Sequence, residues 1–303
     1  MSSVLCIGNA VQDFVFAVER FPASAEKHPA SAFDSVGGGP AATAAVAIAR
    51  LGGTAMLATR LGDDGVADLI VAELEGYGVD CALARRFGGC RSSLSAVLVD
   101  ADGERMIVNY LDADLPADPG WLPTALPPGT GAVLADSRWP EGGAALLSLA
   151  RRAGLPAVLD ADRPAPPDAL IRAASHIAFS GEGLAAWAEN DDHEGALKAL
   201  AADTGAWCGV TLGARGVLCV SNGTVTRVPA FPVRAVDTLG AGDVWHGAFT
   251  LALADGGDEI AAVRFASAAA ALKVQRFGGR AGVPTRAEVD QLLADALCPG
   301  EAS

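Results

Sequence analysis

The sequence predicts an α/β fold in which a mostly parallel sheet is covered by helices on both faces. Short apolar runs and helix-like stretches alternate along most of the 303 residues. The short runs are almost continuously apolar, as expected of strands that are buried on both faces. A chain of this length can bury a large core without disulfides.

The N-terminal part begins this alternation. Strands are expected at 4–8 and 54–60, and helices at 40–51 and 64–77. Pro40 favours a helix start because its missing N–H costs nothing in a first turn. Gly78 stands next to the end of the second helix, where glycine is common.

Two runs interrupt the α/β rhythm. The runs 94–100 and 105–110, joined at Ala101-Asp102-Gly103, predict a hairpin. Together with the stretch near 11–35, this hairpin is expected to form a small β lid on one edge of the sheet. We therefore expect a single domain over 1–303, with lid segments at about 11–35 and 90–112.

The C-terminal half alternates more regularly. Strands are expected at 132–136, 157–160, 176–179, 207–211, 217–220 and 225–228, and helices at 142–153, 194–204, 243–254, 258–276 and 286–296. Asn222-Gly223 is a tight-turn signal between the last two strands.

Charge and composition exclude several function classes. The net charge is −14, which argues against nucleic acid or an anionic membrane surface as the main partner. The six cysteines form no C-x-x-C pair, so reduced thiols are expected, and the four histidines lack metal-ligand spacing. No secretion signal and no apolar run of about 20 residues is present. These features predict a soluble cytoplasmic protein.

The stretch 237–243, Asp-Thr-Leu-Gly-Ala-Gly-Asp, carries the strongest chemical signal. Gly240, Ala241 and Gly242 stand where a helix begins, so their backbone N–H groups and the helix dipole can form an anion hole. Such a hole stabilises a phosphoryl group during transfer. Asp243 beside it can take a proton from an attacking hydroxyl. The alternative is a glycine-rich turn that only caps a helix.

The chain resembles the ribokinase-like (PfkB) carbohydrate kinases over nearly its whole length. The matching stretches are 237–243, the glycine cluster 37–44 followed by Leu51-Gly52, Gly62-Asp63-Asp64-Gly65 and Gly103-Glu104-Arg105. The resemblance implies a ribokinase-like three-layer α/β/α fold with a mostly parallel central sheet and a small β lid. It also implies an ATP-dependent kinase that uses Mg²⁺ and acts on a sugar hydroxyl.

The resemblance further implies residue roles. Asp243 looks like the general base, and Gly240, Ala241 and Gly242 look like the anion hole. Asp13 looks like a ligand of substrate hydroxyls, and Gly38 and Gly39 like a backbone surface against the sugar. The ATP-binding residues implied are Thr211, Gly213, Gly216 and Thr238. A P-loop nucleotide site is excluded because no G-x-x-x-x-G-K-[ST] motif occurs.

One departure from the family concerns magnesium. The family often carries Asn-x-x-Glu at a strand-to-helix turn, but here that turn reads Ser180-Gly181-Glu182-Gly183. The sequence therefore does not identify the metal ligands. Asp160 and Asp162, in the run Asp160-Ala-Asp162-Arg163, are candidates that can act through water.

Within the family, the branch most similar in sequence is the sulfofructose kinases, which phosphorylate the 1-hydroxyl of 6-deoxy-6-sulfofructose. Lys27, Asn109 and Arg138 match the positions that bind the sulfonate in that branch. A sulfonate needs a fixed cation and hydrogen-bond donors, which these residues supply. Each also has a simpler interpretation: Lys27 as a solvated lid residue, Asn109 as a polar strand position, and Arg138 as a partner of Asp112 or Asp114.

Two alternatives stay open. The substrate can be another ketose or sugar acid, such as a fructose or tagatose phosphate or ketodeoxygluconate; a phosphate group carries about two charges and would favour more than one Arg. A non-catalytic sugar-binding protein is the other alternative, although the chain keeps Asp243 and its glycines. A lid with an exposed apolar face predicts a homodimer.

Overall fold

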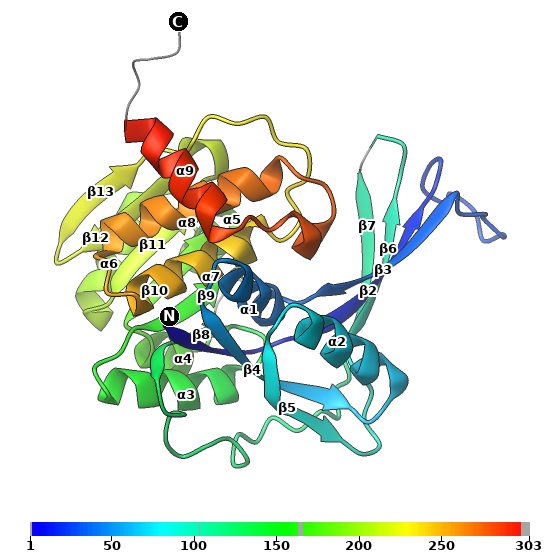
Figure 1. The fold of residues 1–303 in the computed structure, drawn as a ribbon, viewed down its shortest axis with the longest axis horizontal. Helices are drawn as coiled ribbons and strands as arrows, with labels where there is room; N and C mark the ends of the chain where they lie inside the picture. Colours follow the sequence, from blue (N-terminus) through cyan, green and yellow to red (C-terminus); the bar gives the residue numbers. More distant parts are fainter. Residues whose placement is uncertain (1, 103, 163–165, 298–303) are drawn as a thin grey trace, which may run out of the picture.

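The computed structural model describes residues 2–102, 104–162 and 166–297, which fold into a three-layer α/β/α body with a projecting lid (Figure 1). The body sheet contains β1 (Ser3–Ile7), β4 (Thr54–Gly62), β5 (Asp80–Phe87), β8 (Thr130–Asp136), β9 (Ala157–Ala161), β10 (His176–Ser180), β11 (Trp207–Thr211), β12 (Val217–Ser221) and β13 (Thr224–Val228). Its order is β13-β12-β11-β10-β9-β8-β1-β4-β5. Only the β11–β12 and β12–β13 pairs are antiparallel among these strands, so the predicted fold class is confirmed.

Helices cover both faces of this sheet. One face carries α1 (Pro40–Arg50), α2 (Gly65–Gly76), α7 (Ala241–Ala254), α8 (Glu259–Val274) and α9 (Arg286–Leu297), and the other carries α3 (Pro140–Arg152), α4 (Asp168–Ala173), α5 (Gly181–Ala188) and α6 (His193–Thr204). Two 3-10 turns, η1 (Gly213–Arg215) and η2 (Gly279–Gly282), complete the body. Neighbouring residues of each central strand serve different cores: Leu134 of β8 packs under α7, whereas Val133 packs toward α3.

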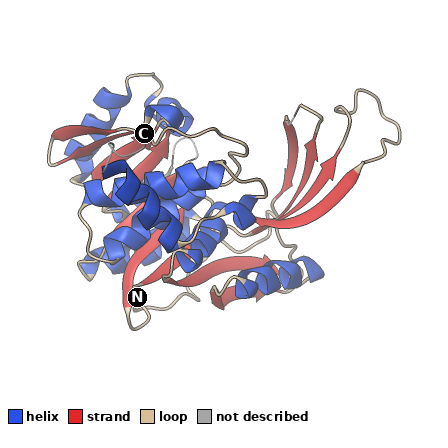
Figure 2. Cartoon of the chain, turned by 45° about the horizontal axis from the view of Figure 1, so that its top comes forward, coloured by secondary structure: helices blue, strands red, loops and turns tan. Residues whose placement is uncertain are grey.

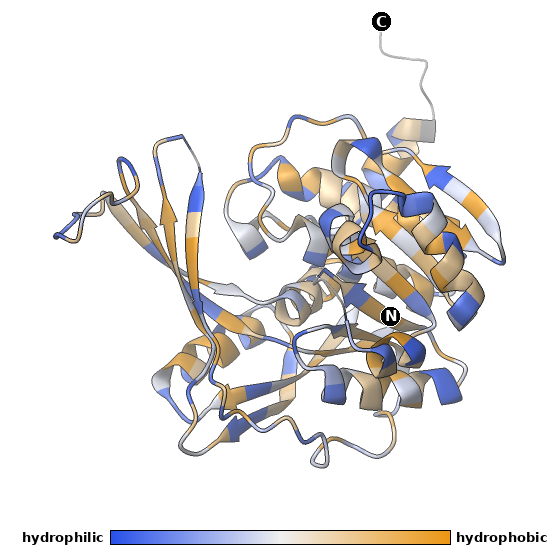
Figure 3. Ribbon diagram, turned by 180° about the vertical axis from the view of Figure 1, so that it is seen from behind, coloured by the Kyte–Doolittle hydropathy of each residue, from blue (hydrophilic) through white to orange (hydrophobic). Residues whose placement is uncertain are grey.

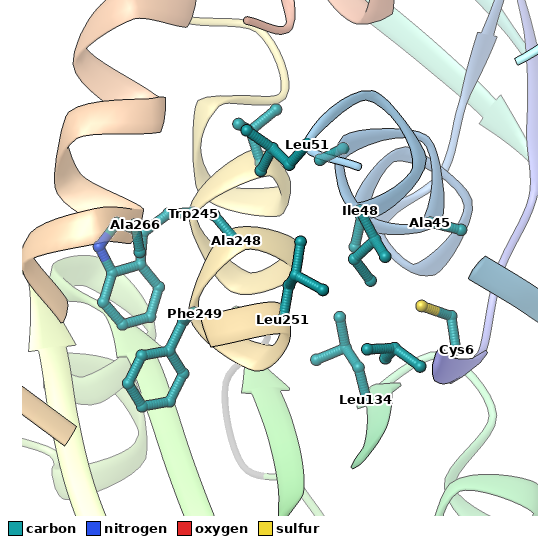
Figure 4. Packing of buried hydrophobic residues seen from close by; sticks show 14 of the residues in the cluster. Cys6, Ala45, Ile48, Leu51, Leu134, Trp245, Ala248, Phe249, Leu251 and Ala266 are labelled. Carbon is teal, nitrogen blue, oxygen red and sulfur yellow. The ribbon is translucent and has the colours of Figure 1, made fainter. Parts of the chain in front are cut away.

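Helices α1 and α7 pack closely against each other. Ile48 of α1 and Leu251 of α7 lie over Leu134 of β8 (Figure 4). A Cβ atom on Gly247 would lie 2.6 Å from the Ala44 carbonyl oxygen, so only glycine permits this approach. The contact places the N-terminal ends of two helices that are 200 residues apart in sequence on one side of the sheet.

The lid is a separate four-stranded sheet that projects from the body (Figure 2). It consists of β2 (Val11–Ala17), β3 (Ala32–Gly38), β6 (Leu94–Val99) and β7 (Arg105–Tyr110), in the order β3-β2-β6-β7. The β6–β7 pair is antiparallel, as the predicted hairpin requires; Gly103 in its turn lies outside the described residues. The β2–β6 pair is parallel.

Several elements differ from the sequence prediction. β5 was not expected because it is an edge strand whose residues Arg85 and Arg86 interrupt the apolar pattern. The short helices α4 and α5 span only 6 and 8 residues and give little periodic signal. α7 begins at Ala241, so Asp243 lies inside its first turn.

Two further expectations concern thiols and membranes. The five described cysteines are free, and Cys6, Cys208 and Cys219 are buried on strands. Among the described residues, no helix has the length and apolarity needed to cross a bilayer.

Replacing Gly247 by valine should separate α1 from α7. We expect a loss of about 1–3 kcal/mol in the free energy of unfolding, measured by urea denaturation, because the added methyl groups meet backbone that cannot move freely. The matched control is Gly76→Ala at the end of α2, where a Cβ atom meets nothing within 4 Å; it should be neutral or slightly stabilising. Equal stability of Gly247→Val and Gly76→Ala would contradict the close packing.

Candidate active site

The candidate site lies where the strand order of the body sheet reverses. The chain runs from β1 outward through β4 to β5, and later from β8 outward through β9 and β10. In such sheets the crevice beyond the carboxyl ends of the two central strands is the usual ligand site. Here the segments that follow β1 and β8 carry Asn9 and Arg138.

The carboxylate of Asp136, at the end of β8, joins these segments. It accepts hydrogen bonds from the backbone N–H groups of Asn9 (2.8 Å), Ala41 (3.1 Å) and Arg138 (2.8 Å). A Cβ atom on Gly8 would overlap this carboxylate at 2.2 Å, which explains the glycine at the end of β1. Burial raises the pKa of Asp136, and the three N–H donors oppose that rise.

The glycine cluster before α1 leaves room for two charged side chains. A Cβ atom on Gly37 would overlap the Arg280 guanidinium at 1.8 Å, and one on Gly38 would lie 2.3 Å from the Asp13 carboxylate. Gly39 has φ +92°, and its Cβ would lie 2.5 Å from the Asn9 carbonyl oxygen. The cluster is therefore a surface against which Asp13 and Arg280 lie directly.

Arg280 has a role that the sequence did not reveal. Its side chain is buried and donates to the Gly38 carbonyl oxygen at 2.6 Å and to Thr43 Oγ1 at 3.3 Å. It also lies 3.4 Å from a carboxylate oxygen of Glu73. The only signal in the sequence is an arginine inside the glycine-rich run 278–282.

The N-terminus of α7 carries the glycine turn for which the sequence predicts an anion hole. Gly240 adopts a left-handed conformation, with φ +72°, and its carbonyl oxygen accepts the Val244 N–H. The Ala241 N–H bonds to Thr238. The N–H groups of Gly242 and Asp243 make no hydrogen bond within the described part of the chain, so both are free to meet an anion.

Asp243 is half-buried in the first turn of α7. Burial raises its pKa to about 7, and the negative charges of Asp162 and Asp136 add to this rise, while Arg280 and Arg138 oppose it. A carboxylate with this pKa binds a proton much more readily than an ordinary aspartate. This property suits a general base near neutral pH.

Two residues that follow Asp243 are packing residues. Trp245 is buried and stacks on Phe249 with ring centroids 5.0 Å apart. His246 is buried, and its Nδ1 lies 2.8 Å from the Gly242 carbonyl oxygen and 3.3 Å from Asp160 Oδ2. Burial lowers the pKa of His246 and raises that of Asp160. His246 thus stabilises the first turn of α7 through its contact with the Gly242 carbonyl oxygen.

A cavity of about 590 Å³ lies between the lid and the body. The strand register places Asp13, Ser95 and Asn109 next to one another in a row across β2, β6 and β7. All three line the cavity. Burial raises the pKa of Asp13, while a hydrogen bond from Ser95 and the charge of Arg280 work against the rise.

Arg138 lines the same cavity from the body side. Its guanidinium donates to Asp162 at 2.6 Å, so the considered pairing with Asp112 or Asp114 is wrong. Asp112 instead accepts the backbone N–H of Arg91. Arg138 Nε is buried without a partner among the described residues. Lys27 is exposed on the 18–31 connection of the lid and is not among the residues that line the cavity.

The residues expected to bind the nucleotide lie outside the lining of the lid cavity. Thr211 ends β11, Gly213 begins η1 and Gly216 directly follows η1; their φ angles are +57° for Gly213 and +83° for Gly216. A Cβ atom on Gly216 would lie 2.1 Å from the Val228 carbonyl oxygen, so this turn requires glycine. Thr238 is exposed. None of these four residues lines the lid cavity.

The turn at which the family often carries Asn-x-x-Glu differs in this chain, where it reads Ser180-Gly181-Glu182-Gly183. Ser180 Oγ accepts the Gly183 N–H as the N-cap of α5, and Glu182 is exposed on that helix. The described residues contain no group of three His, Cys, Asp or Glu side chains placed to hold a metal. Asp160 Oδ1 is buried and unpartnered among these residues. Arg163, which follows Asp162, lies outside the described residues.

Comparison with known proteins agrees with this geometry. The model of the pfkB family carbohydrate kinases matches residues 1–286. Ribokinase of Bacillus subtilis is 31% identical over 97% of this chain and 100% of its own length. A candidate ribokinase from Agrobacterium tumefaciens is 37% identical with a TM-score of 0.89, covering 98% of both chains. Arabidopsis thaliana ribokinase complexed with ribose and ATP is 26% identical with a TM-score of 0.84, covering 96% of this chain and 98% of its own.

The matched family spans the body, the lid and both glycine-rich turns, and the whole fold is similar to that of the solved relatives. The chain therefore belongs to the pfkB family of carbohydrate kinases and is an ATP-dependent sugar kinase of the ribokinase type.

Proposed function

We propose that this kinase transfers the γ-phosphate of ATP to the 1-hydroxyl of 6-deoxy-6-sulfofructose. The observation that carries the proposal is that Arg138 and Asn109 line one cavity from its body and lid sides. Asp13 lies in the same strand row as Asn109. The sugar hydroxyls would meet Asp13, and the distal sulfonate would meet the amide and the guanidinium.

The charges around the cavity favour a singly charged distal group. Arg138 is already paired with Asp162, which removes much of its excess positive charge. Its Nε is buried and lacks an acceptor among the described residues, and a sulfonate oxygen can supply one. A phosphate group carries about two negative charges and would be repelled more strongly by Asp13 and Asp162.

Lys27 would complete the sulfonate site only after the 18–31 connection moves. In the present arrangement its ammonium is exposed on the lid. Closure of a lid around a bound sugar is a common step in kinases and also excludes water. The role of Lys27 is thus tied to a movement of the 18–31 connection.

The proposed chemistry is a direct in-line transfer. Asp243 accepts the proton of the sugar hydroxyl, and the hydroxyl oxygen forms a bond to the γ-phosphorus. The bond between that phosphorus and the β–γ bridging oxygen breaks, and ADP leaves. The free N–H groups of Gly242 and Asp243 would bind the transferring phosphoryl oxygens, with Thr211, Gly213, Gly216 and Thr238 on the nucleotide side.

Magnesium would arrive with the nucleotide. Mg²⁺ is commonly held by one or two carboxylates together with water and phosphate oxygens. Asp162, with 30% of its side chain exposed, and the unpartnered oxygen of Asp160 fit this mode, directly or through water. When bound, the ion would offset phosphate charge that these carboxylates otherwise repel.

A second candidate is a ribokinase activity. It is favoured by 31% identity to the Bacillus subtilis ribokinase over its full length. Asp13 and the glycine surface of Gly38 and Gly39 can bind the hydroxyls of either sugar. The two functions differ in what Arg138 and Asn109 contact.

The raised pKa of Asp243 predicts the pH profile. A base acts only when deprotonated, so kcat/KM should rise with pH, level off above about 7, and fall about tenfold per pH unit below it. Asp243→Asn should lower kcat by roughly 100-fold or more, while sugar binding persists in calorimetry. If Asp243→Asn keeps near-normal turnover and the same loss of activity at low pH, Asp243 is not the base.

The function is tested by coupled ATP-consumption assays with 6-deoxy-6-sulfofructose, ribose, fructose 6-phosphate, fructose and ketodeoxygluconate. We expect the highest kcat/KM with the sulfonated sugar, and Arg138→Ala should raise its KM roughly tenfold or more. Arg138→Lys keeps the charge without the fork and is the matched control, which should lose less. Preference for ribose, with equal effects of Arg138→Ala on all sugars, would favour the ribokinase.

We also propose that the protein forms a homodimer through the outer face of the lid. The strand register turns Phe14, Leu98, Met106 and Val108 away from the cavity row. Val108 is 65% exposed and Met106 42%. Figure 3 shows the apolar colouring of the lid strands. Exposed apolar faces of this kind are usually covered by a partner.

Val108→Asp should convert the dimer to a monomer in analytical ultracentrifugation at micromolar concentration. A buried charge on an apolar interface is costly, so the affinity of dimerisation should fall by an order of magnitude or more. Leu69→Asp on α2, at a site 48% exposed, is the control and should leave the dimer intact. A wild-type protein that sediments as a monomer would rule out the proposal.

A further inference from the structure

The carboxylate of Asp237 is a meeting point of four segments. Its Oδ1 accepts the Leu239 N–H at 2.9 Å, and its Oδ2 accepts the N–H groups of Gly278 at 3.1 Å and Gly279 at 3.4 Å. The buried Lys273 on α8 donates to Oδ2 at 3.2 Å and to the Asp237 carbonyl oxygen at 3.0 Å. These contacts hold the turn that leads into the N-terminus of α7.

The fourth segment is the lid. Arg105, the first residue of β7, donates to Asp237 Oδ1 at 2.6 Å. In the strand register, Arg105 of β7 lies opposite Val99 of β6, which lies opposite Ala17 of β2. This row is far along the lid from the row that contains Asp13. Within the described part of the chain, this is the one ion pair that joins a lid strand to the body.

The charge balance shows that Arg105 is not needed to neutralise Asp237. Lys273 already supplies one positive charge to a carboxylate that has 3% of its side chain exposed. Although burial opposes ionisation, the N–H of Leu239, the Arg105 guanidinium and the Lys273 charge hold the pKa of Asp237 well below its usual range. The Arg105 guanidinium therefore adds a net positive charge beside Asp237, on the cavity side of the turn. Asp237 lies three residues before Gly240 in the sequence.

The position of Arg105 also relates to access. Arg105, Asp237, Gly278 and Gly279 all line the lid cavity, so the ion pair crosses from the lid to the body at that cavity. The Arg105 side chain is 27% exposed, which leaves the pair open to exchange with water when the lid moves. A pair of this kind can form and break during turnover.

We propose that Arg105 is a positioning residue that latches the lid to Asp237, so that lid closure and the geometry of the phosphoryl-transfer turn are coupled. The closed latch keeps water from the transferring phosphoryl group and brings a positive charge near it. This role does not depend on which sugar occupies the cavity.

The test compares Arg105→Ala, Arg105→Lys and the control Arg86→Ala. The Arg86–Asp68 pair has the same 2.6 Å distance but lies on β5 and α2, away from the cavity. With the best sugar of the assay panel, Arg105→Ala should lower kcat/KM by roughly 10- to 100-fold. The share of consumed ATP that yields phosphate instead of sugar phosphate should rise. Arg105→Lys should recover part of both losses, and Arg86→Ala should match the wild type.

Hydrogen–deuterium exchange separates a latch from a structural support. With the sugar and ADP bound, Arg105→Ala should exchange faster over 94–110, while 237–243 stays protected because Lys273 and the backbone donors remain. Wild-type kcat/KM or unchanged exchange over 94–110 in Arg105→Ala would overturn the proposal. Faster exchange over 237–243 alone would also overturn it, because Arg105 would then only support the turn.

Discussion

The site depends on the hydrogen bonds that the buried carboxylate of Asp136 accepts. Burying a charge is costly unless donors surround it, and here three backbone N–H groups from Asn9, Ala41 and Arg138 do so. Without the carboxylate, these N–H groups would lose their acceptor, at about 1–3 kcal/mol for each one that stayed buried. The same carboxylate fixes the end of β1, the first turn of α1 and the segment that carries Arg138. The part of the cavity wall formed by Asn9, Pro40 and Arg138 therefore depends on these contacts.

The second constraint is the cluster of acidic groups near the turn before Asp243, where we propose that phosphoryl transfer takes place. Burial raises the pKa of Asp243 and of Asp160, and the negative charges of Asp162 and Asp136 raise both further. The same charges would repel ATP. The free N–H groups of α7 reduce this conflict, because they can stabilise anions without carrying a full charge. The buried Arg280 also supplies positive charge, but it lowers the pKa of Asp243. Basicity and phosphate binding are thus obtained from different groups in one small volume.

Much of the body could be predicted from the sequence, because buried parallel strands are apolar throughout and most of the helices are long. β5 could not, since an edge strand with Arg85 and Arg86 lacks that pattern. The glycine cluster and the turn before Asp243 were located by their composition. Arg280 was not assigned a role, because its contact with Gly38 joins residues 242 apart and appears only once α1 and η2 are packed together. Lys27 was expected beside Arg138 but lies exposed on the lid connection. The movement that would bring it to Arg138 cannot be predicted from the sequence.

The lid shows most clearly why register matters for function. Successive residues of a strand face opposite sides, so Asp13, Ser95 and Asn109 face the cavity between lid and body while Phe14, Ala96 and Val108 face outward. A slip of one residue between β2 and β6 would exchange the two sets and place apolar groups against the sugar. Composition alone cannot set this register. It is set by the ends of the strands: β2 begins beside Asn9, which Asp136 holds, and β6 follows Ser92, whose side chain and N–H bond to Asp64. The specificity of the lid is therefore determined at its base, where it meets the body, before any side chain contacts a substrate.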